Sequence, residues 1–278
     1  MKNIGLLYNP RVEASLPLAE EISGWLQRRG VKAWICSTHA EPPESVCMDQ
    51  VDLLITLGGD GTILRTMPLA VPARVPVLGL NLGRVGFLTE CTPDHWEEVV
   101  TQIIEGQGTV EERTMFQVLR IREGEVLCRD SALNDAVISR GALARTVRLE
   151  TYIDGVLTTQ YVADGVIIST ATGSTAYSYA VGGPILPPWS DNILVVPVAA
   201  HLSLDRPLVL NADAVVEVKV YTRLPGMLSV DGRMEGELLD GDCVRVERSP
   251  LKARFLRLRH REDFYRTLVE RLTPRNGV

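Results

Sequence analysis

The sequence is short of cysteine, histidine and long hydrophobic runs, and each shortage excludes a kind of protein. Its five cysteines are an odd number without a Cys-x-x-Cys pair, which argues against a disulfide framework and a structural zinc site. The four histidines are scattered, without the spacing of metal ligands. The longest uncharged stretch, 165–190, is interrupted by glycine and proline, so it is not a membrane helix. We therefore expect a soluble, cytoplasmic protein with no membrane partner.

The charge balance and three missing motifs exclude further classes of protein. Lys and Arg number 29 against 35 Asp and Glu, and this net charge of −6 argues against a nucleic-acid partner. The sequence contains no G-x-x-x-x-G-K-[ST], no G-x-G-x-x-G after a strand and no G-x-S-x-G. These absences argue against a P-loop kinase, a Rossmann dinucleotide site and a hydrolase with a serine elbow.

The first third of the chain alternates between strand and helix patterns. Ile22, Trp25 and Leu26 recur at helical spacing. Gly30 follows them, where the end of a helix favours a left-handed residue. The alternation predicts an α/β domain over 1–113, with a parallel sheet and flanking helices. The expected strands are 4–8, 31–35, 51–57 and 75–80.

The remainder of the chain is rich in short β-type runs. Turn signals separate them, notably Asp154-Gly155, Asp231-Gly232 and Asp240-Gly241. We therefore expect a mostly antiparallel, β-rich domain over 114–258. The tail, 259–278, returns to a helical pattern, and we expect it to pack back on the first domain.

The sharpest local signal is Gly58-Gly59-Asp60-Gly61-Thr62, which follows a strand of buried type and precedes a helix. Its glycines let the backbone approach a ligand closely, and amides at the start of the following helix favour a phosphate. A carboxylate repels phosphate, so Asp60 is better explained if it activates a hydroxyl nucleophile or helps to hold Mg²⁺. The alternative is a plain β-to-α turn.

A second segment, 161–184, combines many hydroxyl groups with glycines and other small residues. Hydroxyls can bind phosphate and ribose, and Tyr177 offers a stacking face. The alternative is a Ser/Thr/Gly-rich loop within a β domain. Two shorter segments are weaker signals, because each could be only a turn or a loop. They are Asn134-Asp135 at the start of a strand and the segment Asn81–Leu88 after the fourth strand, where open α/β sheets bind ligands.

Together these segments resemble a known family. Gly58–Thr62 looks like the Gly-Gly-Asp-Gly-Thr motif that NAD kinases share with diacylglycerol kinases, sphingosine kinases and phosphofructokinases. The stretch 164–184 resembles a long motif that is found in NAD kinases only. Further segments fall in the order of that family, namely Asn81-Leu82-Gly83 with Gly86-Phe87-Leu88, then Asn134-Asp135, then 201–203 with 206–207. The resemblance covers nearly the whole chain.

The resemblance implies ATP-dependent phosphorylation of NAD at the 2′-hydroxyl of its adenosine ribose, which gives NADP. It also implies an NAD kinase/diacylglycerol kinase-like fold, in which the active site lies between an α/β N-terminal domain and a β-rich C-terminal domain. Members form homodimers or homotetramers and need Mg²⁺ or another divalent cation. The expected partners are therefore NAD and a phosphoryl donor, either ATP or polyphosphate.

Carried onto this chain, the resemblance makes Asp60 the proton acceptor for the 2′-hydroxyl and Gly61 its backbone partner. Asn134 and Asp135 match the pair that holds the ribose and base of NAD. No residue is assigned as a metal ligand. The expected substrate- and nucleotide-binding residues are Gly58, Gly59, Gly61, Thr62, Arg65, Asn81, Asn134, Asp135, Arg145, Val162, Asp164, Thr172, Thr175, Ala176, Tyr177, Ser178, Tyr179, Ala180 and Arg233.

Four positions depart from the pattern of the family. Asp135 stands where bacterial members commonly carry Glu, so its carboxylate reaches one methylene less far. Val162 occupies a position where members of the family often carry Arg, His or Lys. In the family, that basic side chain is associated with a preference for oxidised NAD over NADH. Ala171 replaces a usual Pro, and Arg233 a frequent Gln.

Two other functions compete with that of an NAD kinase. A lipid kinase of the same superfamily would share Gly58–Thr62 but would gain nothing from 170–178. A non-catalytic NAD(P)-binding regulator would gain from losing Asp60, because its charge repels phosphate. NAD binding and turnover separate the three functions, since the lipid kinase would ignore NAD and the regulator would bind it without turnover.

Overall fold

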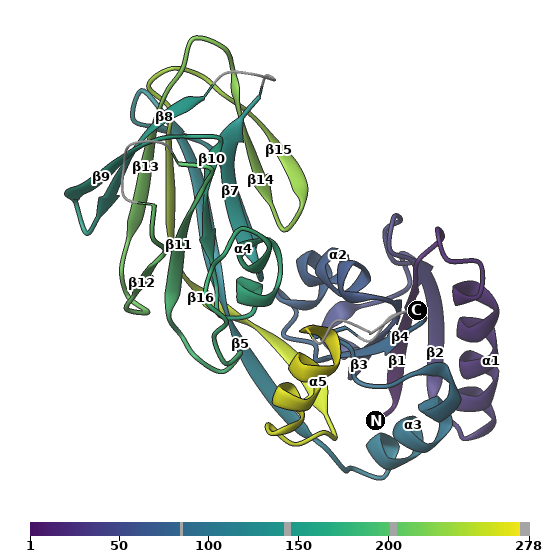
Figure 1. Ribbon diagram of the computed structural model, residues 1–278. Helices are drawn as coiled ribbons and strands as arrows, with labels where there is room; N and C mark the ends of the chain where they lie inside the picture. Colours follow the sequence, from purple (N-terminus) through teal and green to yellow (C-terminus); the bar gives the residue numbers. More distant parts are fainter. Residues whose placement is uncertain (84–85, 142–145, 201–204, 273–278) are drawn as a thin grey trace. The chain divides into compact units, whose positions relative to one another are not determined.

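The computed structural model describes residues 1–83, 86–141, 146–200 and 205–272. The chain divides into two compact units (Figure 1). Unit 1 comprises Met1–Glu112 and Ala253–Val278, and unit 2 comprises Arg113–Lys252. Two long strands, β5 (Thr109–Arg122) and β16 (Cys243–Arg257), have residues in both units.

Unit 1 is built on a parallel sheet. Its strands are β1 (Asn3–Tyr8), β2 (Lys32–Ser37), β3 (Leu53–Gly58) and β4 (Val77–Asn81), in the order β2-β1-β3-β4. Every residue of β3 and β4 is buried, as is usual for parallel strands that are covered on both faces. The end of β16 extends the sheet beside β4, where Phe255 pairs with Val77. The predicted α/β domain with a parallel sheet is confirmed.

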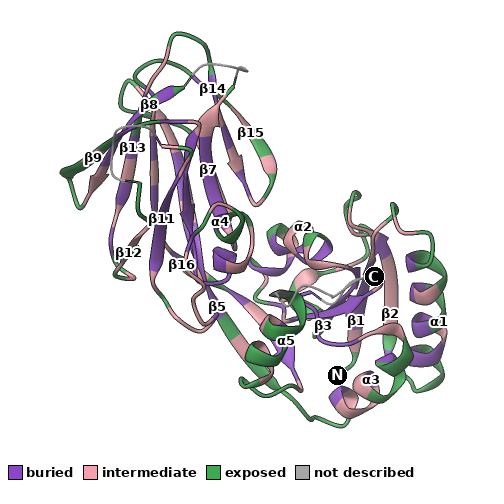
Figure 2. Ribbon diagram, viewed as in Figure 1, coloured by how far each residue is buried: buried purple, intermediate pink, exposed green. Residues whose placement is uncertain are grey.

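The helices of unit 1 are α1 (Ser15–Arg28), α2 (Asp60–Ala70), α3 (Trp96–Ile104) and α5 (Asp263–Leu272), with 3₁₀ turns η1 (Met48–Gln50) and η2 (Pro93–His95). Helix α1 buries Ile22, Trp25 and Leu26 and exposes its other side (Figure 2). Gly30 follows it with a φ of +76°. Trp25 meets Trp96 of α3 edge to face at 5.5 Å between ring centroids, so α1 and α3 pack together in one core. No helix in the described ranges is long and apolar enough to cross a membrane.

Unit 2 consists of antiparallel sheets. Besides β5 and β16, its strands are β6 (Glu125–Ala132), β7 (Asp135–Arg140), β8 (Val147–Ile153), β9 (Val156–Ala163), β10 (Gly165–Ser169), β11 (Ile193–Val198), β12 (Leu208–Leu210), β13 (Val216–Tyr221), β14 (Gly226–Val230) and β15 (Arg233–Leu238). One sheet has the order β12-β11-β10-β7-β14-β15, and the other joins β16 to β13, β8 and β9. The predicted β-rich domain is confirmed.

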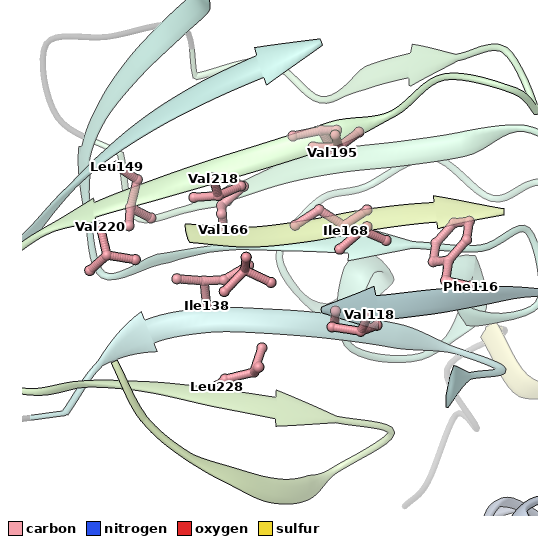
Figure 3. Close-up of a cluster of buried hydrophobic side chains, with 14 of the residues drawn as sticks. Phe116, Val118, Ile138, Leu149, Val166, Ile168, Val195, Val218, Val220 and Leu228 are labelled. Carbon is pink, nitrogen blue, oxygen red and sulfur yellow. The ribbon is translucent and has the colours of Figure 1, made fainter. Parts of the chain in front are cut away.

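Side chains from both sheets of unit 2 form one core. Val166 and Ile168 of β10 lie in it with Val218 and Val220 of β13 (Figure 3). Burial alternates along β13 and β14, because one face of each strand packs on this core. After β10 the chain forms a 3₁₀ turn, η3 (Gly173–Thr175), and a short helix, α4 (Tyr177–Ala180). This places the second polar motif at the end of a buried strand.

Candidate active site

The Gly-Gly-Asp-Gly-Thr segment forms the turn between β3 and α2. Strand β3 ends at Gly58, Gly59 caps the helix in an extended conformation, and α2 begins at Asp60. Thr62 is buried, and its Oγ1 accepts the N–H of Gly59 at 3.3 Å. A Cβ at Gly58 would overlap the same Oγ1, so only glycine leaves room for it. Thr62 therefore stabilises the turn from the inside.

Gly61 is exposed on the first turn of α2. A Cβ at this position would meet no described atom within 4 Å. The first turn of a helix carries amide groups without intrahelical acceptors and the positive end of the helix dipole. The open side of Gly61 thus gives an anion access to this helix terminus.

The carboxylate of Asp60 is held by the loop that follows β4. Its Oδ2 accepts the N–H of Phe87 at 2.9 Å, and its Oδ1 accepts the N–H of Leu88 at 3.1 Å. A Cβ at Gly86 would overlap Oδ1, so the glycine permits the close approach of this loop. The N–H of Gly86 donates to Oγ1 of Thr89 at 3.0 Å, which closes the loop on itself. Two amides therefore fix the orientation of one carboxylate.

The C-terminal helix packs on the same loop. The ring centroids of Phe87 and Phe264 of α5 lie 6.2 Å apart. The guanidinium carbon of Arg271 lies 4.6 Å from the centroid of the Phe87 ring, within the range of a cation–π contact. Helix α5 thus contacts the residue whose amide donates to Asp60.

Asn81 shapes the start of this loop. It is buried at the end of β4, and its Nδ2 donates to the carbonyl of Gly83 at 3.0 Å. Its Oδ1 accepts the N–H of Gly83 at 3.3 Å and would lie 4.0 Å from a Cβ at Gly59. Asn81 therefore lies beside the glycine turn. Arg65 lies exposed on α2, five positions after Asp60.

In unit 2 the structure brings Asn134 and Asp135 together with the segment after β10. The N–H of Thr170 donates to the carbonyl of Asn134 at 2.9 Å. A Cβ at Gly173 would overlap that carbonyl. Asp135 is buried at the start of β7, and burial, followed by the charge of Asp231, raises its pKa to about 7. A carboxyl group that titrates near neutrality is typical of a functional site.

The segment from Thr172 to Ala180 combines buried hydroxyls with exposed rings. Thr172 is buried, and its Oγ1 accepts a hydrogen bond from Arg113 at 3.4 Å. Thr175 donates through Oγ1 to the carbonyl of Thr172 at 3.3 Å. Within the described part of the chain, the buried Oγ of Ser178 has no hydrogen-bond partner. The remaining expected residues here, Ala176, Tyr177, Tyr179 and Ala180, are exposed or half-buried, and Tyr177 and Tyr179 expose 45% and 42% of their surface.

Two expected binding residues are engaged in ion pairs. Oδ1 of Asp164 lies 3.0 Å from Nε of Arg140, and both side chains are half-buried. Nη2 of Arg233 lies 2.8 Å from Oδ2 of Asp130. Arg233 also lies near Glu235, with 3.6 Å between Nε and Oε1. Both expected residues are thus oriented by an oppositely charged neighbour.

Val162 is one of the residues that line a cavity rich in arginine. It is 41% exposed on β9 and lines a cavity of about 520 Å³ together with Arg140 and Arg148. The valine brings no charge to this cavity. Arg145 lies outside the described residues, as do positions 201–204 of the later motif.

No group of three His, Cys, Asp or Glu side chains within the described ranges is placed to hold a metal ion. Mg²⁺ commonly takes one or two protein oxygens and completes its shell with water and substrate phosphates. Asp60 fits such a partial role, because each of its oxygens accepts one backbone amide N–H and has a second lone pair.

Two contributions to the site escaped the sequence analysis. One is the pair of hydrogen bonds from the amides of Phe87 and Leu88 to Asp60, although the segment 81–88 itself was singled out from its place after the fourth strand. The other is Asp231, which looked only like a turn residue. Its carboxylate accepts N–H groups from the segment that contains Asn134 and Asp135. No local pattern distinguishes it from the other Asp-Gly turns.

Two family models match the chain. The ATP-NAD kinase N-terminal domain matches residues 38–108, and the ATP-NAD kinase C-terminal domain matches residues 133–258. The NAD kinase of Chloroflexus aurantiacus is 43% identical over 274 residues, which cover 98% of this chain and 99% of the relative. The NAD kinase of Dehalococcoides mccartyi is 38% identical over 282 residues, covering 99% and 97%.

Solved structures show the same fold. Yeast NADH kinase complexed with NADH superposes with a TM-score of 0.87 at 24% identity, over 100% of this chain and 89% of that one. An NAD kinase from Archaeoglobus fulgidus in complex with ATP gives a TM-score of 0.75 at 25% identity, over 96% and 97%. Family models in both parts of the sequence and relatives matched over nearly their full length agree, and the chain belongs to the NAD kinase family.

Proposed function

We propose that the protein transfers the γ-phosphoryl group of ATP to the 2′-hydroxyl of the adenosine ribose of NAD, with Asp60 as the general base. Phosphorylation of NAD is the reaction of the family to which the chain belongs. The assignment of the base is supported by one observation above all. Asp60 lies at the first position of α2, beside an open glycine, with its carboxylate oriented by two backbone amides.

The chemistry needs little from the protein besides positioning and charge stabilisation. The 2′-oxygen of NAD attacks the γ-phosphorus of ATP, and the bond from that phosphorus to the bridging oxygen breaks, so that ADP leaves. Asp60 accepts the hydroxyl proton as the new bond forms. The amides of Phe87 and Leu88 keep the carboxylate from rotating, which fixes the distance over which the proton moves.

The start of α2 is suited to the phosphates. Its dipole and its first amides favour negative charge, and Gly59 and Gly61 let phosphate oxygens come close. A divalent cation would reach this place with the nucleotide, and Asp60 could supply one oxygen to it. When bound, Mg²⁺ would neutralise part of the charge on the phosphoryl oxygens. The donor is ATP in this proposal, and polyphosphate is the alternative to be tested.

Unit 2 is proposed to hold the dinucleotide. Asn134 and Asp135 would bind the ribose and base of NAD, and the exposed ring of Tyr177 would provide a stacking face. Support comes from the contact of Asn134 with Thr170 and from the raised pKa of Asp135. The family resemblance associates a basic side chain at position 162 with a preference for oxidised NAD. Because this chain has Val162 there, NADH is included as a substrate in the tests below.

We also propose a homodimer or homotetramer that works in the cytoplasm. The assembly is supported by the family resemblance alone. The cytoplasm is supported by the five cysteines, which lie in the described ranges as free thiols and are typical of a reducing compartment. The net charge of −6 supports a protein without a nucleic-acid partner.

Turnover tests the reaction and the base together. NADP formed from NAD, ATP and Mg²⁺ is measured with an NADP-specific dehydrogenase, with NADH as acceptor and polyphosphate as donor in parallel. Asp60→Asn should keep the fold and lower kcat by about 10²–10⁴-fold, the usual contribution of a positioned base. Near-normal kcat in this variant would remove the role assigned to Asp60.

A matched control lies at the other end of the same strand. Asp52 precedes β3, is exposed, and also accepts two backbone N–H groups, from Lys2 and Asn3. Asp52→Asn should leave kcat unchanged. The comparison separates the loss of a general base from the loss of a carboxylate that only accepts backbone N–H groups. Wild-type protein that binds NAD in calorimetry without turnover on either donor would favour the non-catalytic regulator.

A further inference from the structure

The three Asp-Gly turns of unit 2 look alike in sequence but differ in what their carboxylates hold. Asp154 is exposed and accepts one N–H, from Val215 at 2.9 Å. Asp240 is exposed and accepts one N–H, from Thr222 at 2.9 Å. Asp231 is partly buried and accepts three. The carboxylate of Asp231 therefore accepts more hydrogen bonds than those of the other two turns.

The three donors to Asp231 are consecutive residues. Oδ2 accepts the N–H of Leu133 at 2.8 Å, and Oδ1 accepts those of Asn134 at 2.8 Å and Asp135 at 3.1 Å. In return, the N–H of Asp231 donates to the carbonyl of Asp135 at 3.0 Å. Four hydrogen bonds therefore tie the turn after β14 to the backbone at the start of β7. Three N–H groups that converge on one carboxylate allow a single arrangement of that backbone.

We propose that Asp231 is a positioning residue for dinucleotide binding, which acts by setting the direction and the charge of the Asn134-Asp135 pair. The inference rests on the proposed function, because it takes Asn134 and Asp135 as the residues that hold NAD. Asp231 itself needs no contact with the substrate. Its carboxylate sets the backbone angles from which both side chains project, and a displaced backbone would misdirect both at once.

The charge of Asp231 adds an effect that a neutral support would not have. It is the second cause, after burial, of the raised pKa of Asp135. Burial also raises the pKa of Asp231, while its three N–H bonds and Arg233 of β15 oppose that rise. The strands paired with β7 place the uncharged Ser169 opposite Asp135 and the uncharged Val230 one position further on. Asp231 is thus the charged neighbour through which Asp135 can be tuned.

The sign of the effect on NAD binding follows from the proton balance. Below a pH of about 7, Asp135 takes up a proton and loses acceptor capacity for ribose hydroxyls. KM for NAD should therefore rise as the pH falls through the neutral range. If the charge of Asp231 is removed, Asp135 should ionise at a lower pH, and the rise in KM should move to lower pH.

The test is steady-state kinetics of the full chain, wild type and Asp231→Asn, across the neutral pH range. Asparagine keeps the size of the side chain but presents an NH₂ group where one oxygen accepted an N–H. We expect KM for NAD to rise about tenfold or more, as for a lost hydrogen bond to a charged group. KM for ATP and kcat should change by less than about twofold, since the effect is confined to binding. The inflection in KM for NAD should move to lower pH.

Asp154→Asn is the matched control, because Asp154 has the same turn sequence, a φ of +51° against +49° for Asp231, and an exposed carboxylate. It should leave both KM values and the pH profile unchanged. Unchanged KM for NAD and an unmoved inflection in Asp231→Asn would overturn the inference. So would equal losses in kcat and in both KM values, which indicate a general structural role.

Two further variants keep the result unambiguous. If Asp231→Asn does not fold, Asp231→Glu keeps the charge but displaces it by one methylene. That variant should raise KM for NAD and retain the inflection, and unchanged KM would overturn the inference. Asp135→Asn should abolish the inflection. If instead it leaves both KM for NAD and the inflection unchanged, the role of Asp135 in the proposed function fails, whatever Asp231 does.

Discussion

Gly86→Ala tests whether the loop after β4 positions the catalytic carboxylate. A Cβ at Gly86 would overlap Oδ1 of Asp60 and lie 2.9 Å from Oγ1 of Thr89. Ordinary contacts between such atoms are near 3.5 Å, so relief of the overlap needs a shift of more than about 1 Å. Either Asp60 turns away or the loop retreats, and both movements break the bonds from the amides of Phe87 and Leu88.

The expected loss of activity exceeds the expected loss of stability. A misplacement of about 1 Å at a reacting group can lower kcat about 10²-fold. Overpacking of this kind typically lowers the free energy of unfolding by about 1–3 kcal/mol, which a domain of ordinary stability tolerates. We therefore expect a folded protein with kcat reduced about 10²-fold and KM for NAD changed little.

Turnover by the coupled dehydrogenase assay and urea unfolding are measured on the same samples. Gly83→Ala is the matched control, since a Cβ there would meet no described atom within 4 Å and the residue belongs to the same loop. It should keep nearly wild-type kcat. If Gly86→Ala keeps wild-type kcat, the loop does not set the position of Asp60, and the reasoning from the two amides is refuted.

Two further predictions concern stability. Glu90 and Arg257 form a buried ion pair at 3.0 Å, so Glu90→Gln should lower the free energy of unfolding by about 3–5 kcal/mol in urea. Glu112→Gln, at a half-exposed pair, should cost about 1 kcal/mol or less, and equal costs would contradict this reasoning. Burial and the charge of Asp231 raise the pKa of Asp135 from 3.8 to about 7, so the folded chain retains a proton that the unfolded chain loses in this window. The free energy of unfolding should therefore fall as the pH rises through it, by at most a few kcal/mol. Asp135→Asn should reduce that dependence, and an unchanged slope would exclude Asp135 as its source.

Much of the fold could be predicted because its signals are local. The continuous apolar run of β3 marks a strand buried on both faces, and the glycine at position 30 marks the end of α1. Thr92-Pro93 is a typical start of a helix, and the segment after it is helical, but it opens with the 3₁₀ turn η2 before α3 begins at Trp96. A proline in a first turn signals where a helix starts but not how tightly its first turn is wound.

The candidate site was predictable only in part. Asp60 stood out because a carboxylate within a glycine-rich phosphate-binding turn would repel the phosphate. This repulsion indicated that Asp60 has a chemical role, as a base or a magnesium ligand. Thr62 carries the same motif signal, yet its hydroxyl stabilises the turn through Gly59. Sequence spacing cannot separate these two roles, because both need a polar side chain at the start of the helix.

The sequence by itself determined the α/β and β-rich parts, the glycine turn and the family, since periodicity, turn residues and motifs are written in consecutive positions. Only the tertiary structure decided that the amides after Gly86 hold Asp60 and that Phe264 packs on Phe87. It alone distinguished Asp231 from two identical-looking turns. Each of these contacts joins residues from separate parts of the chain. Such contacts depend on which strands become neighbours in the folded chain, and the local sequence pattern does not predict this arrangement.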